Sequence, residues 1–332
     1  MHYFYLDVLR GFSAIMIVLY HYTTRYIENP ITDNPAKVDW LITFPYGCAA
    51  VSTFFILSGF LTSKYIFNSD KKDIPTFVKR RFIRLYPSFL ITMLSTAFVL
   101  KFFFSNIEIS LLQVVVNLTM VPSLFGQRAI DGVYWTLQVE LFFYLGVIFL
   151  MLIKREVGKK TFLLFWLSVP LIVKCVDNKI IDSFLNIVFI ANHISLFLAG
   201  VGIFLLNKKN ENKIYSLLLL FLCFISQLFL SDITQIAFFI VSIFFIIYVT
   251  RFINVSIQHS YLTFFLKKIG DISYPLYLFH QMVGFTLIYS IQTKYWISSE
   301  FIIIFPIVIS VLYSYLVHEY VEIIIQKRFG KR

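Results

Sequence analysis

The sequence predicts an all-α, polytopic membrane protein with about ten transmembrane helices and with both termini in the cytoplasm. Of its 332 residues 59% are hydrophobic and only 14% are charged, whereas soluble domains carry about 25% charged residues. Apolar stretches of membrane length recur from one end of the chain to the other. The Lys and Arg residues, which give a net charge of +11, fall in short clusters between those stretches.

The candidate spans follow from the roughly 20 apolar residues that an α-helix needs to cross a bilayer. They cover residues 5–25, 44–66, 82–104, 134–153, 160–177, 184–206, 214–231, 233–250, 272–291 and 300–323. The fifth span carries Lys174 and is interrupted by Pro170. Because apolar stretches fill the chain, we expect residues 1–332 to form a single membrane-embedded domain.

The distribution of basic residues predicts the orientation. Roughly three times as many Lys and Arg residues lie in the connections assigned to the cytoplasm as in those assigned to the outer side. Residues 109–125 are apolar enough for an eleventh span, but a crossing there would turn every later basic connection outward. We therefore expect a re-entrant or interfacial helix on the outer face. Residues 257–268 are expected to form a short amphipathic helix on the inner surface.

Several other classes of partner and site are disfavoured. The basic clusters match membrane topology rather than a nucleic-acid-binding surface. Cys48, Cys175 and Cys223 are odd in number and far apart, so neither a disulfide framework nor a metal site is expected, and no permanently bound cofactor is predicted. The first span lacks a basic segment before it and is expected to be retained. The lipid bilayer is the expected surrounding, and a bacterial inner membrane is the default location.

The first span carries Asp7, Arg10 and His21. On an α-helix all three lie on one face, with a rise of roughly 16 Å from Arg10 to His21. Ionisable groups at membrane depth are costly and usually mark a substrate or proton pathway. The alternative is a structural Asp7–Arg10 pair near the inner surface and a His21 that only hydrogen-bonds a neighbouring helix.

This arrangement resembles a known family. Asp7-Val-Leu-Arg10-Gly11, followed by His21 after ten residues, is similar to the start of the acyltransferase 3 family, whose characterised members are mostly O-acyltransferases of cell-surface polysaccharides. The resemblance implies that His21 acts as a general base or carries the acyl group. It also implies an acyl-coenzyme A, such as acetyl-coenzyme A, as donor substrate.

Two further motifs lie near the predicted inner surface. Ser58-Gly59 in the second span resembles the family's Ser-Gly-Phe element, although small residues often only let membrane helices pack. The start of the third span carries Arg80, Arg81 and Arg84. One interpretation is that they only reflect the excess of basic residues on the cytoplasmic side. The other is that they bind the donor phosphates, because their spacing resembles the family's Arg-x-x-Arg motif followed by Tyr-Pro. These five residues form the predicted donor site.

The fourth and ninth spans carry the remaining candidates. Trp135 and Glu140 belong to Trp-Thr-Leu-Gln-Val-Glu-Leu-Phe-Phe-Tyr, which follows Tyr134. This segment is the most specific match to the family, with Thr136 in place of the family's usual Ser. Tyr134 and Trp135 are candidate substrate-binding residues or only interfacial anchors, whereas Glu140 is expected to orient His21. His280, in a segment similar to the family's Ile-Ser-Tyr-x-Leu-Tyr-Leu-x-His pattern, is expected to line the site or to pack helices.

Near the end of the chain, His318-Glu319-Tyr320-Val321-Glu322 stands where the family commonly shows Glu followed by Lys-Pro. We expect these ionisable side chains to form a solvated helix end. Arg10 is expected either to pair with Asp7 or to stabilise an oxyanion.

The function that the resemblance implies is transfer of an acetyl or similar acyl group from cytoplasmic acyl-coenzyme A to a hydroxyl of an extracytoplasmic glycan. O-antigen, capsule and exopolysaccharide are the acceptor classes that the resemblance implies. The alternative is a membrane transporter in which the buried Asp, Arg, His and Glu form a substrate or proton path. A transporter needs no acyl-coenzyme A, so donor consumption separates the two.

Overall fold

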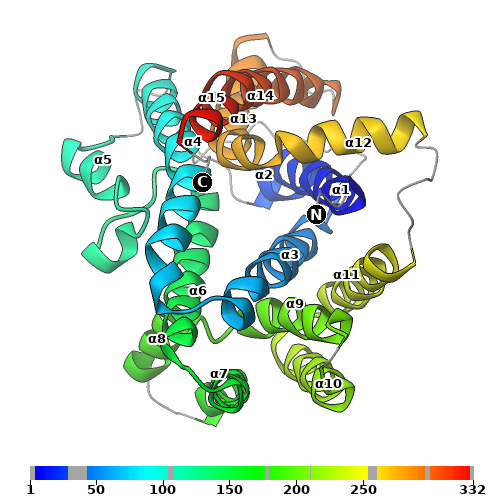
Figure 1. Cartoon of the computed structure of the whole chain (residues 1–332). Coiled ribbons are helices and arrows are strands. Elements are labelled where there is room, and N and C mark those ends of the chain that lie inside the picture. The colour runs from blue at the N-terminus through cyan, green and yellow to red at the C-terminus, as the bar shows by residue number, and fades with distance from the viewer. Residues whose placement is uncertain are drawn as a thin grey trace. The chain divides into compact units, whose positions relative to one another are not determined.

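The computed structural model describes residues 4–28, 43–103, 108–175, 179–209, 211–252, 260–295 and 300–329. Within these residues the regular secondary structure is entirely helical and includes no strand, which confirms the predicted all-α class (Figure 1). The chain divides into two compact units, each built from three segments. Unit 1 comprises Met1–Leu6, Ala49–Val78 and Val139–Tyr261, and unit 2 comprises Asp7–Cys48, Lys79–Gln138 and Leu262–Arg332.

Unit 1 contains most of the middle of the chain. Its helices are α3 (Gly47–Asn68), η2 (Lys71–Asp73), α6 (Trp135–Leu152), α7 (Glu156–Cys175), α8 (Lys179–Val188), α9 (Ile194–Asn207), α10 (Lys213–Leu230) and α11 (Ile233–Arg251). Capping side chains begin the last two of these. Asn212 accepts a hydrogen bond from the Ile214 amide, and Asp232 accepts one from the Gln235 amide. Such caps satisfy amides that the first turn of a helix leaves unpaired.

Helix α9 is the core of unit 1. It is apolar on every side and almost wholly buried, as expected for a helix surrounded by others. It contacts α7, α10 and α11. Against α3 the two backbones approach closely, because a Cβ at Gly59 would lie 1.9 Å from the Phe197 carbonyl oxygen and one at Gly200 would lie 2.0 Å from that of Ile56. Small residues allow this approach in membrane proteins.

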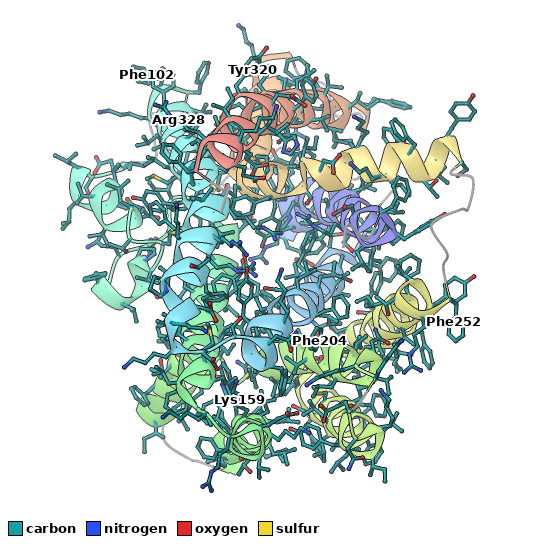
Figure 2. All side chains as sticks on the ribbon, in the orientation of Figure 1. Phe102, Lys159, Phe204, Phe252, Tyr320 and Arg328 are labelled. Atoms are coloured by element: carbon teal, nitrogen blue, oxygen red, sulfur yellow. The ribbon has the colours of Figure 1, made fainter. Side chains whose placement is uncertain are left out.

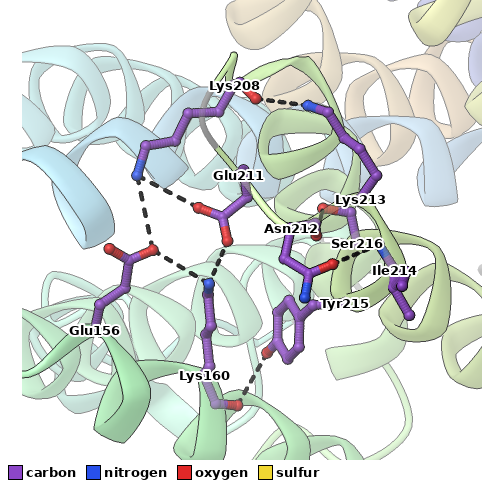
Figure 3. A network of polar contacts seen from close by, with 9 residues as sticks. All are labelled: Glu156, Lys160, Lys208, Glu211, Asn212, Lys213, Ile214, Tyr215 and Ser216. Carbon is purple, nitrogen blue, oxygen red and sulfur yellow. Dashed lines mark hydrogen bonds and ion pairs between the residues drawn. The ribbon is translucent and has the colours of Figure 1, made fainter.

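A network of ion pairs joins α7 to the connection between α9 and α10 (Figure 3). The buried carboxylate of Glu211 pairs with Lys160 and, at 3.5 Å, with Lys208. Glu156 pairs with the same two lysines at 3.3 and 3.8 Å. Burial raises the pKa of Glu211, but the hydrogen bonds and charges of these neighbours outweigh burial and bring it below its ordinary value. The network therefore stabilises the charged carboxylate.

Unit 2 contains most of the first helix and the C-terminal segment of the chain. Its elements are α1 (Phe4–Tyr20), η1 (His21–Arg25), α2 (Tyr26–Glu28), α4 (Ile74–Phe103), α5 (Leu111–Asn117), η3 (Pro122–Phe125), η4 (Gly132–Tyr134), α12 (Tyr261–Asp271), α13 (Ser273–Tyr295), η5 (Glu300–Ile303), α14 (Ile304–Val317), η6 (His318–Glu322) and α15 (Ile323–Phe329). Helices α1, α3, α4, α6 and α12 contribute residues to both units.

Two glycine contacts hold α1 against α12. A Cβ at Gly11 would lie 1.8 Å from the Leu266 carbonyl oxygen, and one at Gly270 would lie 2.0 Å from that of Asp7. Helix α13 packs along α14 (Figure 1). Phe279 on α13 stacks on Tyr313 of α14 with 3.7 Å between the ring centroids. These contacts fix the helices that carry the polar residues described below.

Within the described residues, seven helical segments are long and apolar enough to cross a membrane. They are Phe4–Glu28, Ala49–Asn68, Lys71–Phe103, Gly132–Leu152, Lys213–Leu230, Ile233–Arg251 and Phe301–Phe329. They coincide with seven of the ten predicted spans. Helices α7 and α13 occupy the predicted fifth and ninth spans without being among the seven. The number ten and the orientation of the termini stay predictions.

The predicted span 184–206 is wrong as a single helix. The chain forms α8 up to Val188, turns through residues 190–193, and starts α9 at Ile194. Ile190 adopts the left-handed conformation, with φ of 48°, which a continuous α-helix does not permit. Pro170, by contrast, does not end α7, which runs on to Cys175. Neighbouring groups in membrane helices often compensate the hydrogen bond that a proline removes.

The segment expected to be re-entrant or interfacial forms no membrane-length helix. Helix α5 has only 7 residues, capped by Ser110, and the short turn η3 follows it. This agrees with the expectation that residues 109–125 do not cross the bilayer. Of the expected amphipathic segment 257–268, residues 257–259 lie outside the described residues, and α12 begins at Tyr261.

Many apolar side chains face outward, as they do in proteins that contact lipid. Phe102 and Tyr320 project from unit 2 and Phe252 projects from unit 1 (Figure 2). Each of the three is about two-thirds exposed. Soluble proteins rarely expose so many large apolar side chains, so these surfaces agree with an integral membrane protein.

Candidate functional site

His21 lies where the first helix changes its geometry. Helix α1 ends at Tyr20, and residues His21–Arg25 form a π-helical turn. Such wide turns are rare and occur often at functional sites. The His21 side chain is partly exposed, whereas the next side chain, Tyr22, is fully buried.

The closest polar partner of His21 is a second histidine. Nε2 of His280, on α13, lies 2.9 Å from Nδ1 of His21, and the two rings meet edge to face with centroids 4.8 Å apart. Nδ1 of His21 also lies 3.0 Å from the Ile17 carbonyl oxygen. His280 itself is fully buried, and its Nδ1 lies 3.0 and 2.9 Å from the carbonyl oxygens of Leu276 and Tyr277. The two imidazoles thus form a short hydrogen-bonded chain.

Tyr22 holds the two histidine-bearing segments together. Its hydroxyl donates to the His280 carbonyl oxygen at 2.8 Å and lies 2.9 Å from the hydroxyl of Ser310 on α14. The Tyr22 ring rests on Gly284, where a Cβ would lie 2.1 Å from a ring carbon. No larger residue fits at position 284 without moving this ring. The distance between His21 and His280 is therefore set by buried contacts.

Arg10 forms a second polar centre in unit 2. Its guanidinium contacts the Asp7 carboxylate at 3.3 Å and donates to the Ser273 hydroxyl at 3.0 Å. Arg10 also lies within electrostatic range of Arg84 on α4 and of Glu322 near the end of the chain. The predicted pair of Asp7 and Arg10 is therefore present, and it is part of a larger charged cluster.

The prediction that His318, Glu319 and Glu322 form a solvated helix end is wrong for Glu322. Glu322 is only 7% exposed and accepts hydrogen bonds from the Ser88 hydroxyl at 2.8 Å and from Nδ1 of His318 at 2.6 Å. The turn His318–Glu322 is π-helical. The sequence showed no partner for Glu322, because Ser88 lies 234 positions away.

The three arginines of the predicted donor site lie on one stretch of α4. The Arg80 side chain is exposed, and those of Arg81 and Arg84 are partly buried. Close by, the Tyr274 hydroxyl at the start of α13 donates to the Leu85 carbonyl oxygen at 3.0 Å. Ser273, the neighbour of Tyr274, accepts the hydrogen bond from Arg10. Arg84 therefore lies on the part of α4 that is close to the Arg10 cluster.

Tyr134 and Trp135 occupy different surroundings. Tyr134 is buried, with its ring edge to face against Phe89 at 5.3 Å between centroids, whereas Trp135 is 44% exposed. Three residues before Tyr134 lies the fully buried Asp131. Its carboxylate accepts hydrogen bonds from the Val133 amide at 3.1 Å and from the Met282 amide at 3.0 Å. Burial outweighs these bonds and raises the pKa of Asp131 to about 7. Asp131 therefore ties the Tyr134 turn to α13.

Glu140 and Ser58 form a separate polar group in unit 1. The Ser58 hydroxyl donates to Glu140 at 3.0 Å, and the Tyr144 hydroxyl donates to the same carboxylate oxygen. Gly59 packs on α9 as described above, so its small size is needed for helix packing. Within unit 1 the Glu140 carboxylate is thus held by two hydroxyl groups. Its predicted role in orienting His21 stays a prediction.

The described residues include no group of three or more His, Cys, Asp or Glu side chains placed to hold a metal ion. The polar groups of unit 2 instead offer an imidazole with one engaged ring nitrogen and an arginine-rich cluster. An imidazole in this setting can take a proton from a hydroxyl or can attack a thioester. Arginines can bind phosphates or a developing negative charge.

A family model for an acyltransferase domain, that of the acyltransferase 3 family, matches residues 3–319. The chain belongs to the acyltransferase 3 family. The match covers nearly all of the sequence and includes every candidate residue named above except Glu322. The family assignment confirms the resemblance found in the motifs and shows that the chain is a membrane acyltransferase by class.

Two curated proteins are similar to part of the chain. A putative acetyltransferase, ORF330, of Acidianus two-tailed virus is 27% identical over 157 residues, which are 47% of this chain and 42% of the relative. Nodulation protein 10 of Rhizobium leguminosarum bv. viciae is 28% identical over 171 residues, which are 45% of this chain and 44% of that relative. The chain thus matches less than half the length of either. No solved structure matches.

Sequence reasoning missed several residues around the site. Tyr22, Ser88, Asp131 and Glu322 are buried and hydrogen-bonded to distant parts of the chain. Tyr22 follows His21, but nothing in the sequence distinguished it from the other aromatic and apolar residues of the first span. Asp131 had a detectable signal, because it is an acidic residue four positions before Trp135, where the segment that resembles the family's Trp-Ser-Leu signature begins.

Proposed function

We propose that this protein moves an acetyl or similar acyl group from a cytoplasmic acyl-coenzyme A to a hydroxyl of an extracytoplasmic glycan. Membership of the acyltransferase 3 family supports the transfer, and one relative carries the name of a putative acetyltransferase. The proposed location is a bacterial inner membrane. The glycan acceptor and the coenzyme A donor come from the family resemblance.

The observation that carries the proposal is the surroundings of His21. Its Nδ1 is engaged by His280 and by the Ile17 carbonyl, whereas its Nε2 makes no hydrogen bond within the described residues. A ring nitrogen with an available lone pair is what a general base needs. The His21 side chain is partly exposed, and we place the acceptor hydroxyl beside this nitrogen.

The proposed reaction breaks the thioester and forms an ester. The acceptor hydroxyl oxygen attacks the thioester carbonyl carbon while its proton moves to Nε2 of His21. The carbon–sulfur bond then breaks, and the coenzyme A thiolate leaves and receives that proton. In the two-step version Nε2 attacks first and carries the acyl group before the hydroxyl takes it. Both versions use the same nitrogen.

The charged cluster would serve the donor. Arg84, Arg81 and the exposed Arg80 offer planar donors that suit the phosphates of coenzyme A. Arg10 either remains paired with Asp7 or stabilises the oxyanion that forms on the thioester carbonyl. Tyr134 and Trp135 remain candidates for the acceptor side.

The decisive experiment measures consumption of labelled acetyl-coenzyme A by the purified protein in lipid, with and without a panel of surface glycans. The wild type is expected to hydrolyse or transfer the acetyl group. His21→Ala is expected to lose this activity, because a general base contributes about 10²–10⁴-fold. His193→Ala, which changes a histidine of unit 1, is the matched control.

Two results would contradict the proposal. Undiminished turnover by a folded His21→Ala protein would remove His21 from the mechanism. Absence of donor binding and turnover in the wild type with every glycan would favour the transporter alternative, in which the same face carries a substrate or proton.

A further inference from the structure

His280 makes more polar contacts than a side chain that only packs two helices together needs. It is fully buried, yet each of its ring nitrogens has a polar partner. The tautomers of the two imidazoles determine which ring nitrogen of His21 has a lone pair and can accept a proton. The inference below rests on the proposed function, since it concerns the base of that reaction.

The hydrogen of His280 is placed by its own helix. Its Nδ1 lies near two main-chain carbonyl oxygens, those of Leu276 and Tyr277. A carbonyl oxygen can only accept, so Nδ1 must be the donor. A neutral imidazole carries a single ring hydrogen, and Nε2 of His280 therefore has a free lone pair that points to His21 at 2.9 Å.

The hydrogen of His21 follows from that assignment. Its Nδ1 faces two acceptors, Nε2 of His280 and the Ile17 carbonyl oxygen. Nδ1 must then be the donor, which leaves Nε2 of the neutral ring without a hydrogen. Main-chain carbonyls of two helices thus determine the hydrogen positions of both histidines.

We propose that His280 is a positioning residue that keeps the hydrogen of His21 on Nδ1, so that Nε2 presents its lone pair to the acceptor hydroxyl. During the reaction the hydroxyl proton moves to Nε2 of His21. The Nδ1 hydrogen stays in its bond to His280, which stabilises the imidazolium without gaining a proton. The proton then passes from Nε2 to the leaving thiolate, and His280 ends as it began.

The surrounding contacts serve this geometry. Tyr22 donates to the His280 carbonyl, and Gly284 admits the Tyr22 ring, so α13 is held at a set distance from the π-helical turn. In a Ser-His-Asp triad the carboxylate selects the histidine tautomer and orients the ring. Here the neutral Nε2 of His280 has that role. A neutral partner avoids the cost of a second buried charge.

The test is a nitrogen NMR measurement on protein that contains ¹⁵N-labelled histidine in lipid. Ring-nitrogen shifts report which nitrogen carries hydrogen, and His21→Gln identifies the His21 signals by their loss. At a pH where His21 is neutral, the wild type is expected to show hydrogen on Nδ1 of His21 and on Nδ1 of His280. Hydrogen on Nε2 of His21 would overturn the proposal.

Two variants extend the test to turnover. His280→Phe keeps an aromatic ring but removes the acceptor, and we expect kcat to fall by about 10- to 100-fold with an unchanged KM for acetyl-coenzyme A. His280→Gln offers an amide oxygen near the position of Nε2 and is expected to recover most of kcat. Equal losses in folded Phe and Gln variants, or no loss in either, would overturn the role of His280.

The two proposals fail separately. If the wild type consumes no acyl donor, the proposed function fails, while the NMR spectrum still decides whether His280 sets the His21 tautomer. If turnover is present and depends on His21 but the tautomer is reversed, only the role of His280 fails. Variants that do not fold leave the wild-type spectrum as the deciding measurement.

Discussion

The Tyr22 hydroxyl donates a hydrogen bond of 2.8 Å to the main-chain carbonyl of His280, although the two residues lie 258 positions apart. The bond joins the π-helical turn that begins at His21 to the middle of α13. Because Tyr22 is fully buried, no water replaces this partner. The contact therefore helps to position His21, the proposed base, although Tyr22 itself takes no part in the reaction.

Tyr22→Phe is expected to lower both stability and activity. The loss of one buried hydrogen bond costs about 1–2 kcal/mol, and the Ser310 hydroxyl loses a partner as well. We expect kcat to fall several-fold, because His21 and His280 become less well aligned. Thermal unfolding in detergent and acetyl-coenzyme A turnover measure the two effects. Tyr261→Phe, which changes a tyrosine that is 97% exposed, is the control.

Gly284→Ala is expected to disrupt the same contact more severely. The added Cβ would lie 2.1 Å from a ring carbon of Tyr22, so the ring or α13 must move, at a cost of about 1–3 kcal/mol. Gly132→Ala is the matched comparison, because its nearest neighbour is the Gln281 side-chain amide at 3.2 Å. Equal melting temperatures for the two variants would contradict the packing described for Tyr22.

Glu322 and Glu319 are expected to differ sharply on substitution, although they lie in one turn. Glu322→Leu removes the acceptor of Ser88 and His318 and leaves buried donors unpaired, which costs about 1–3 kcal/mol. Glu319→Leu changes a partly exposed side chain and should stay within about 0.5 kcal/mol of wild type. Unfolding midpoints of the two variants in one detergent decide the point.

Arg84→Ala is expected to raise the KM for acetyl-coenzyme A by about 10-fold or more with a smaller effect on kcat. The reason is the loss of a charge-assisted bond to phosphate, which is worth about 1.5–3 kcal/mol. Arg328→Ala changes an exposed arginine on α15 and should leave KM unchanged. A kcat defect without a KM change in Arg84→Ala would argue that Arg84 supports Arg10 rather than the donor.

The Glu211 network predicts a pH dependence of stability. Because the folded-state pKa of Glu211 is lowered, its contribution is fully present above the unfolded-state pKa of about 4.3 and is lost as pH falls through the folded value. Glu211→Gln should therefore unfold at a lower temperature than wild type near neutral pH. The difference should shrink below about pH 4. A difference that grows with acidity would contradict the ion-pair assignment.

The sequence determined the class of the protein and most of its spans. Membrane-length apolar stretches alone predict helices such as α6 and α11, because a polypeptide in lipid must satisfy its backbone internally. The motif spacing also identified the family and marked His21, Arg10 and Glu140 as candidates. The break between α8 and α9 was missed, because the hydrophobicity of residues 184–206 does not reveal the turn at Ile190.

Only the tertiary structure decided which polar side chains meet. His21 and His280 lie 259 positions apart in the sequence, and Ser88 and Glu322 lie 234 apart. A sequence shows how each helix distributes its faces, but not which face a neighbouring helix covers. That choice depends on close packing at glycines such as Gly284 and Gly11, and it determines whether a buried ionisable group obtains a partner.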